Sequence, residues 1–132
     1  MLLADSSVWI DFFNGVERPE THILESKIPT GGIWLGDLIA AEVLQGIDSE
    51  PEFERVTELF TTVPQLTICD AAIAVQAARN FRQLRSMGIT IRKTIDTLIA
   101  TRCIVDGYAL LFSDRDFQPF VDHLGLASAT GA

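Results

Sequence analysis

Short apolar runs alternate along the chain with longer segments that carry apolar residues at helical spacing. The runs at residues 2–4, 33–35, 66–69 and 109–112 predict short buried strands. The segments between and after them predict helices over residues 8–13, 19–27, 38–45, 52–60, 71–87, 95–105 and 117–124. Buried strands that alternate with helices indicate an α/β fold, in which helices cover both faces of a parallel sheet.

Capping residues mark several of the predicted helix ends. Asp37, Asp70 and Thr94 each precede a predicted helix, where a side-chain oxygen can accept a hydrogen bond from the first turn. A glycine follows each of these helices, at positions 46, 88 and 107. These pairs of signals set the boundaries of the three helices.

Length and composition fit one globular domain. The chain has 132 residues, of which 48% are apolar and 21% are charged, so we expect a single domain over residues 1–132. No apolar run approaches the roughly 18 residues that cross a bilayer, and the N-terminus lacks the features of a signal peptide. We therefore expect a cytoplasmic protein without a membrane segment.

The net charge of −8 is distributed unevenly. Residues 79–116 contain seven basic and four acidic side chains and carry +3, which leaves −11 for the rest of the chain. The overall charge argues against a polyanionic partner, whereas this segment offers basic groups that could contact one. Solvated helix faces explain these basic residues equally well.

Four acidic residues stand beside apolar runs. Asp5 follows the first predicted strand, Glu42 lies inside an apolar helix, Asp96 opens another helix and Asp116 follows the last strand. An ionised carboxylate beside buried surface is costly unless a partner offsets it, and the sequence shows no matching Lys or Arg for each acid. A divalent cation such as Mg²⁺ or Mn²⁺, which prefers oxygen ligands, could neutralise all four.

The predicted topology can bring these acids together, because ligand sites of α/β folds lie outside the carboxyl ends of the strands. The sequence therefore predicts a metal-dependent phosphodiester hydrolase. Asp5, Asp96 and Asp116 are the expected metal ligands, bound directly or through water. Glu42 is either a further ligand or the group that orients the attacking water, and Asp114 is an additional candidate.

Simpler explanations exist for individual residues. Asp5 and Asp116 could cap helices, Asp96 could interact with a helix dipole, Asp114 could be a loop residue and Glu42 could be exposed. The joint pattern, with each acid at the functional end of an element, is harder to explain by chance.

Four other side chains give weaker evidence of a functional role. Ser6 and Thr94 could donate hydrogen bonds to the acids or could simply cap helices. Cys69 and Cys103 are too few and too far apart for a zinc site and are expected to be small buried hydrophobes.

Three segments of the chain resemble the PIN-domain family: LLADSSVWIDFF, GDLIAAEVLQG and RKTIDTLIATRCIVDGYALLFSDRDF. The resemblance runs from residue 2 to residue 120, and the motif spacing is similar to the VapC branch, the toxin ribonucleases of toxin–antitoxin pairs. The ordered set of acids is its specific part. The family's acid after strand one matches Asp5, its helix glutamate matches Glu42, and the acid of K-x-x-D-x-x-I-A matches Asp96. The acid before the final Phe matches Asp116, and some members also carry an acid like Asp114.

The resemblance implies an α/β/α sandwich with a central parallel sheet, and an endoribonuclease that uses one or two Mg²⁺ or Mn²⁺ ions. It implies RNA as the substrate, and some members of the family cut tRNA. It also implies a homodimer that is inhibited by a small antitoxin of the VapB type, whose C-terminal segment lies across the acidic groove.

Two groups of side chains are candidates for contacts with these partners. Apolar docking surface could come from four aromatic residues of the first third of the chain, although a place in the core is somewhat more reasonable for each: Trp9, Phe12, Phe13 and Trp34. Basic residues that flank the acids could hold an RNA backbone, or could simply be solvated: Arg92, Lys93 and Arg115.

Two other functional classes remain open. A phosphotransfer enzyme of the haloacid dehalogenase type also begins with an Asp at a strand end, but it usually has a second Asp two residues later, where this chain has Ser7. A non-catalytic RNA- or protein-binding module on the same fold would not need all four acids.

Overall fold

A parallel sheet forms the centre of the computed structural model, which describes residues 1–130. Its strands are β1 (Leu2–Ala4), β2 (Ile33–Gly36), β3 (Gln65–Leu66), β4 (Ala109–Leu111) and β5 (Ala127–Ser128). They lie in the order β3-β2-β1-β4-β5, and every neighbouring pair is parallel. In the register of the central strands, Leu3 lies opposite Trp34 on one side and Leu110 on the other.

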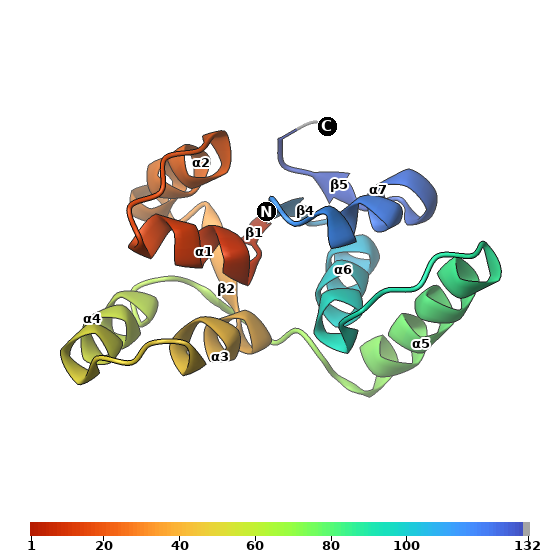
Figure 1. The fold of residues 1–132 in the computed structure, drawn as a ribbon, viewed down its shortest axis with the longest axis horizontal. Coiled ribbons are helices and arrows are strands. Elements are labelled where there is room, and N and C mark those ends of the chain that lie inside the picture. The colour runs from red at the N-terminus through yellow and green to blue at the C-terminus, as the bar shows by residue number, and fades with distance from the viewer. Residues whose placement is uncertain (131–132) are drawn as a thin grey trace.

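Helices cover both faces of this sheet. They are α1 (Ser6–Phe13), α2 (Pro19–Lys27), α3 (Asp37–Gln45), α4 (Glu50–Phe60), α5 (Ala71–Ser86), α6 (Thr94–Asp106) and α7 (Gln118–Leu124), with short 3₁₀ helices η1 (Ile28–Thr30) and η2 (Arg115–Phe117). Figure 1 shows α1–α4 on one side of the strands and α5–α7 on the other. Right-handed crossovers require this division, because the chain moves outward from β1 to β3 and then returns past β1 to reach β4. The predicted α/β/α architecture is confirmed.

The core contains strand residues and the inner faces of both helix layers. Leu3, Ile33 and Leu110 of the strands are fully buried, as is Phe120 of α7. Trp9 of α1 is also fully buried, so the core position that was the more reasonable expectation for it is confirmed, and it supplies no docking surface. The other three aromatic candidates are partly buried against the core: Phe12, Phe13 and Trp34.

The predicted strand at residues 66–69 is shorter than expected, because side chains take over its backbone groups. The N–H of Ile68 donates to the Asp37 carboxylate at 2.9 Å, and its carbonyl accepts from Arg102 Nε at 2.9 Å. Asp37 was expected as a helix cap, but it is the first residue of α3, and Gly36 occupies the N-cap position. Asp37 therefore fastens the loop before α5 to the start of α3.

Smaller differences lie at other element ends. Thr94 is the first residue of α6 rather than its cap, whereas Asp70 caps α5 as expected. The edge strand β5 has two residues and no apolar run to reveal it. Cys103 is buried as expected, but Cys69 is only partly buried. Within residues 1–130, no helix has the length and apolar character that crossing a membrane requires.

Candidate metal site

The carboxyl ends of β1 and β4 meet at the centre of the sheet, where the strand order changes direction. From β1 the chain continues to β2 on one side, while β4 lies on the other side. Asp5 directly follows β1, and its backbone N–H donates to the carbonyl of Leu111, the last residue of β4, at 2.9 Å. A crevice at such a reversal point is where open α/β sheets bind ligands.

Three carboxylates converge beside this point. Oxygens of Asp96, Asp114 and Asp116 lie within 4.8 Å of one another. Asp96 comes from the first turn of α6, and the other two come from the segment that follows β4. Asp114 also caps η2, where its Oδ1 accepts the N–H of Asp116 at 2.9 Å. This hydrogen bond fixes the two acids of the turn relative to each other. We call Asp96, Asp114 and Asp116 the acid cluster.

Asp5 lies next to the acid cluster and is 3% exposed. Its Oδ2 accepts the Ser7 hydroxyl at 2.6 Å and the Ser7 N–H at 3.3 Å. Burial raises the pKa of Asp5, the hydrogen bonds from Ser7 oppose that rise, and the charge of Asp114 adds to it. Ser7 is thus a partner that sequence reasoning missed, since it considered Ser6 and Thr94. The Asp-x-Ser spacing at a helix start was the signal that could have revealed it.

Glu42 projects from α3 toward Asp5. Burial raises the pKa of Glu42, and the charge of Asp5 raises it further, while the nearby Ser6 hydroxyl and Lys93 oppose the rise. Its Oε1 is buried and has no hydrogen-bond partner among the described residues. Glu42 is half-buried, so the simpler explanation that it is an exposed residue is wrong.

Asp96 is the electrostatic centre of the site. It is 4% exposed, and its Oδ2 is buried without a partner in the described part of the chain. Burial raises the pKa of Asp96 to about 7, and the charges of Asp5, Asp114 and Glu42 contribute to this rise against the opposing charge of Lys93. The structure thus brings the oxygens of Asp96, Asp114 and Asp116 together, and the charges of Asp5 and Glu42 also act on Asp96.

Asp116 has a basic partner, although the sequence led us to expect none. Arg92, in the loop before α6, donates to Asp116 Oδ2 from Nη2 at 2.9 Å and from Nε at 3.2 Å. The pairing raises the pKa of the Arg92 guanidinium, mainly through the hydrogen bond and the charge of Asp116. Of the predicted acids, Asp116 therefore has its own counter-charge.

The donor set fits a hard divalent cation. The groups that converge are carboxylates, and such cations prefer oxygen ligands. Two of their buried oxygens, Glu42 Oε1 and Asp96 Oδ2, are unpartnered within residues 1–130. Buried polar atoms without partners are rare in folded proteins and call for an explanation such as an ion. A metal ion would supply one.

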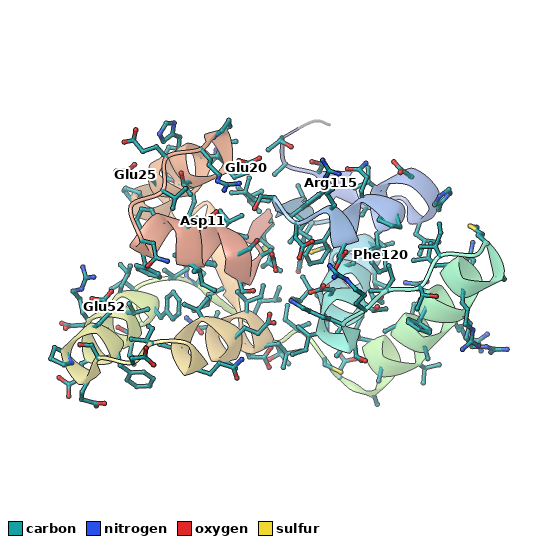
Figure 2. The ribbon with its side chains drawn as sticks, in the orientation of Figure 1. Asp11, Glu20, Glu25, Glu52, Arg115 and Phe120 are labelled. Atoms are coloured by element: carbon teal, nitrogen blue, oxygen red, sulfur yellow. The ribbon has the colours of Figure 1, made fainter. Side chains whose placement is uncertain are left out.

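Exposed charged side chains are unevenly distributed between the two halves of the molecule. Arg79, Arg82 and Arg85 are exposed on α5, in the same half as the acid cluster. Figure 2 shows Arg115 in this half as well, whereas the half built from α1–α4 carries Asp11, Glu20, Glu25 and Glu52. Exposed arginines therefore lie in the same half as the acid cluster, although the net charge of the chain is negative.

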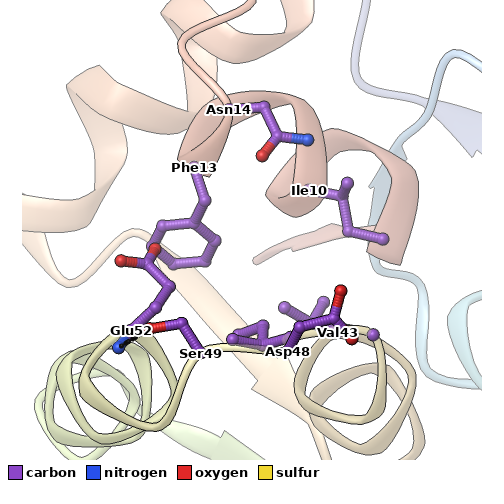
Figure 3. A pocket seen from close by; sticks show the side chains of 9 residues that line it. Ile10, Phe13, Asn14, Val43, Asp48, Ser49 and Glu52 are labelled. Carbon is purple, nitrogen blue, oxygen red and sulfur yellow. Dashed lines mark hydrogen bonds between the residues drawn. The ribbon is translucent and has the colours of Figure 1, made fainter.

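A separate hollow of about 340 Å³ lies between α1 and the segment that joins α3 to α4. Figure 3 shows Ile10, Phe13 and Asn14 on one side of it, facing Asp48 and Glu52 on the other. Its lining combines apolar side chains with two acids, and it does not include residues of the acid cluster.

A family model described as the PIN domain matches residues 2–120. The chain belongs to the PIN-domain family. PIN-domain relatives include a VapC ribonuclease of Mycobacterium bovis and ribonuclease VapC11 of Mycobacterium tuberculosis, each 29% identical over 133 residues, with 98% of this chain and 98% of the relative covered. Ribonuclease VapC1 of Methanocaldococcus jannaschii is 29% identical over 125 residues, with 95% of this chain and 84% of the relative covered. The resemblance noted in the sequence is confirmed.

Solved structures share this PIN fold. One is VapBC2 from Rickettsia felis bound to a DNA fragment from their promoter, with a TM-score of 0.76 and 15% identity over 96% of both chains. Another is a toxin–antitoxin complex from Klebsiella pneumoniae, with a TM-score of 0.69 and 18% identity over 97% of both chains. At these identities the similarity establishes the fold alone.

Proposed function

We propose that this protein is a metal-dependent endoribonuclease and the toxin of a toxin–antitoxin pair. The observation that carries the proposal is the approach of the Asp96, Asp114 and Asp116 oxygens to within 4.8 Å at the reversal point of the sheet. Membership of the PIN-domain family and the similarity to proteins named VapC ribonucleases support the same activity.

In this proposal the acid cluster holds Mg²⁺ or Mn²⁺, and Asp5 contributes directly or through water. A divalent cation in such a site lowers the pKa of bound water and neutralises charge on the scissile phosphate. Ser7 keeps the Asp5 carboxylate oriented through its hydroxyl at 2.6 Å. Asp114 keeps the turn that carries Asp116 in place through its own hydrogen bond.

Glu42 is proposed to orient the attacking water rather than to hold the metal. Both Glu42 and Asp5 lie outside the group of three whose oxygens share the 4.8 Å limit, but the charge of Asp114 acts on the pKa of Asp5, whereas Asp5 is the acid that acts on the pKa of Glu42. Its buried Oε1 lacks a protein partner within residues 1–130 and is therefore available to accept a hydrogen bond from water. The raised pKa of Glu42 also makes it a better proton acceptor than an exposed glutamate.

Exposed basic side chains in the half built from α5–α7 are proposed to hold the RNA backbone. Arg79 and Arg82 are exposed on α5, and Lys93 and Arg115 are exposed beside the acids. Side chains of this type contact phosphates and position a nucleic acid without reading its sequence. A structured RNA such as tRNA and a single-stranded RNA are both suitable first substrates, since nothing in the site selects one.

The test is cleavage of these RNAs by the purified protein in Mg²⁺ or Mn²⁺, with and without a chelator. We expect cleavage that the chelator stops, and its loss in Asp96→Asn, which keeps the side-chain shape but removes the charge. Cleavage by Asp96→Asn at the normal rate would assign the activity to a contaminant. RNA binding without cleavage by the wild type would instead favour the non-catalytic binding module.

A phosphotransfer enzyme of the haloacid dehalogenase type is a weaker alternative. That reading requires a second acid two residues after Asp5, and the residue there is Ser7, whose hydroxyl donates to Asp5. A phosphatase assay with a small phosphate ester separates the two activities, because the nuclease site is expected to leave such an ester intact.

We further propose an antitoxin of the VapB type as the partner, together with a homodimer in a cytoplasmic setting. The two similar structures support the antitoxin, since one is VapBC2 from Rickettsia felis and the other is a toxin–antitoxin complex from Klebsiella pneumoniae. An arginine of an antitoxin could bind the cluster's carboxylates in a bidentate manner and block RNA. Co-expression with the small protein encoded by the adjacent gene should give a complex without RNA cleavage.

Sedimentation of the protein should give a dimer, and a monomer at micromolar concentration would contradict the homodimer.

A further inference from the structure

Arg92 places a positive charge on a carboxylate that the proposed metal ion would also use. Both Nε and Nη2 of Arg92 donate to one oxygen of Asp116, Oδ2, at 3.2 and 2.9 Å. Asp116 shares the 4.8 Å cluster with Asp96 and Asp114. One carboxylate therefore belongs to an ion pair and to a candidate metal site at once.

The ion pair leaves the buried part of the cluster without a partner. Asp96 is 4% exposed, and its Oδ2 has no hydrogen-bond partner in the described chain. Arg92 is bonded to Asp116 instead, on the more exposed side of the cluster. The unpartnered oxygen of Asp96 indicates that a cation other than Arg92 completes the site.

The surroundings of Arg92 permit it to leave Asp116. Its side chain is 75% exposed, so it can move into solvent without opening the core. Exposed ion pairs contribute little to stability, while a positive guanidinium beside a divalent cation would repel it. Metal binding and the Arg92–Asp116 pair are therefore opposed.

We propose that Arg92 is the resident counter-cation of Asp116 and that a divalent metal ion must displace its guanidinium to bind the acid cluster. This inference rests on the proposed metal site. It makes Arg92 a residue that lowers metal affinity while keeping the Asp116 carboxylate placed in the metal-free protein. The ion pair thus sets the metal concentration at which the site fills.

The test measures Mn²⁺ binding by isothermal titration calorimetry, without RNA. Arg92→Gln removes the charge and is expected to tighten Mn²⁺ binding about three- to tenfold, in keeping with the modest strength of exposed ion pairs. Arg115→Gln is the matched control, because it removes an exposed charge next to Asp116 in sequence that forms no ion pair within residues 1–130. We expect it to change affinity by less than about twofold, since screening weakens unpaired surface charges.

A double-mutant comparison ties the effect to Asp116. In the Asp116→Asn background, Arg92→Gln is expected to lose its effect on Mn²⁺ affinity, because the pair no longer exists. Arg92→Lys, which keeps the charge, should remain closer to the wild type than Arg92→Gln. An effect of Arg92→Gln that persists unchanged in Asp116→Asn would overturn the proposal.

The outcomes also separate this inference from the proposed nuclease. Equal Mn²⁺ affinity of wild type, Arg92→Gln and Arg115→Gln would overturn the role of Arg92 and leave the metal site standing. Absence of Mn²⁺ binding in the wild type and in Arg92→Gln would overturn both. Binding that appears only in Arg92→Gln would support the displacement directly.

Discussion

The backbone N–H of Asp5 donates to the carbonyl of Leu111 at 2.9 Å, one residue beyond the end of β1. This bond continues the β1–β4 ladder to the point where the turn carrying Asp114 and Asp116 begins. The register of the two central strands thus fixes the distance between the acid after β1 and the acids after β4. A site built on rigid elements holds its geometry better than one built on loops alone.

The first prediction separates the metal ligands from Glu42. Asp114→Asn is expected to weaken Mn²⁺ binding at least about tenfold, because loss of a charged ligand costs more than loss of a neutral hydrogen bond. Glu42→Gln is expected to change Mn²⁺ affinity by less than about threefold and to lower the cleavage rate about a hundredfold or more, in the range for loss of a general base. Calorimetry and single-turnover cleavage measure the two effects.

Two results would contradict the assignment of Asp114 as a metal ligand and of Glu42 as the residue that orients water. Equal loss of Mn²⁺ binding in both would make Glu42 a ligand. Unchanged binding in Asp114→Asn would leave Asp116 as the only ligand from the turn that follows β4. Asp122→Asn, an exposed acid on α7, is the control and should change neither quantity.

The second prediction concerns the pH dependence of stability in the metal-free protein. The pKa of Asp96 is about 7 in the folded state against a usual value of 3.8, so between these pH values the native state binds more protons than the unfolded state. The contribution of Asp96 to the free energy of unfolding then falls as pH rises from about 4 to about 7. Urea unfolding in the presence of a chelator measures it across this range.

Asp96→Asn removes this source of instability. We expect the variant to be more stable than the wild type at pH 8 by about 1–3 kcal/mol and nearly equal to it at pH 4, because each pKa unit corresponds to about 1.4 kcal/mol before screening. Addition of Mn²⁺ at pH 8 should stabilise the wild type and leave the variant unchanged. A variant less stable than the wild type at pH 8 would contradict the raised pKa.

The site could be predicted from the sequence because its acids belong to the topology. Asp5 and Asp116 follow apolar runs that read as strands, and the carboxyl ends of parallel strands share one edge. Glu42 was informative because it interrupts an apolar helix. The prediction of an α/β fold was therefore sufficient to predict that the acids lie close together.

The parts that the sequence did not reveal depend on contacts across the fold. Arg92 and Asp116 are 24 positions apart, and their ion pair depends on how the loop before α6 meets the turn after β4. The early end of β3 has a similar origin, because Asp37 and Arg102 take the backbone groups of Ile68 from 31 and 34 positions away. No local periodicity encodes such contacts.

The third prediction tests the basic face of α5. Arg79→Gln combined with Arg82→Gln is expected to weaken RNA binding, measured in the Asp96→Asn background so that the RNA is not cleaved. The slope of log K against log salt concentration should become smaller by roughly one to two, because fewer phosphate contacts release fewer counterions on binding. Fluorescence anisotropy over a range of KCl concentrations measures it. Arg55→Gln on α4, where Arg55 pairs with Glu52, is the control and should have no effect. An unchanged slope in the double variant would mean that these arginines are only solvated.

The last prediction tests the hollow beside α1 as part of the docking surface for the proposed antitoxin. Ile10 lines this hollow and is 39% exposed, so Ile10→Asp changes the surface with little effect on the core. Buried apolar anchors dominate many interfaces, and Asp48 in the same lining would attract a basic segment, whereas Glu52 is already paired with Arg55.

We expect Ile10→Asp to weaken binding of the adjacent gene's product about tenfold or more, because an interface anchor is worth at least about 1.4 kcal/mol. RNA cleavage by the free protein should remain at the wild-type rate, since Ile10 lies outside the acid cluster. Val75→Asp, which places the same charge on an exposed apolar position of α5, is the control and should bind normally. Binding is measured by calorimetry on variants that have similar melting temperatures. Equal affinity of both variants for the antitoxin would show that it does not dock at α1, and would leave the metal-site proposal unaffected.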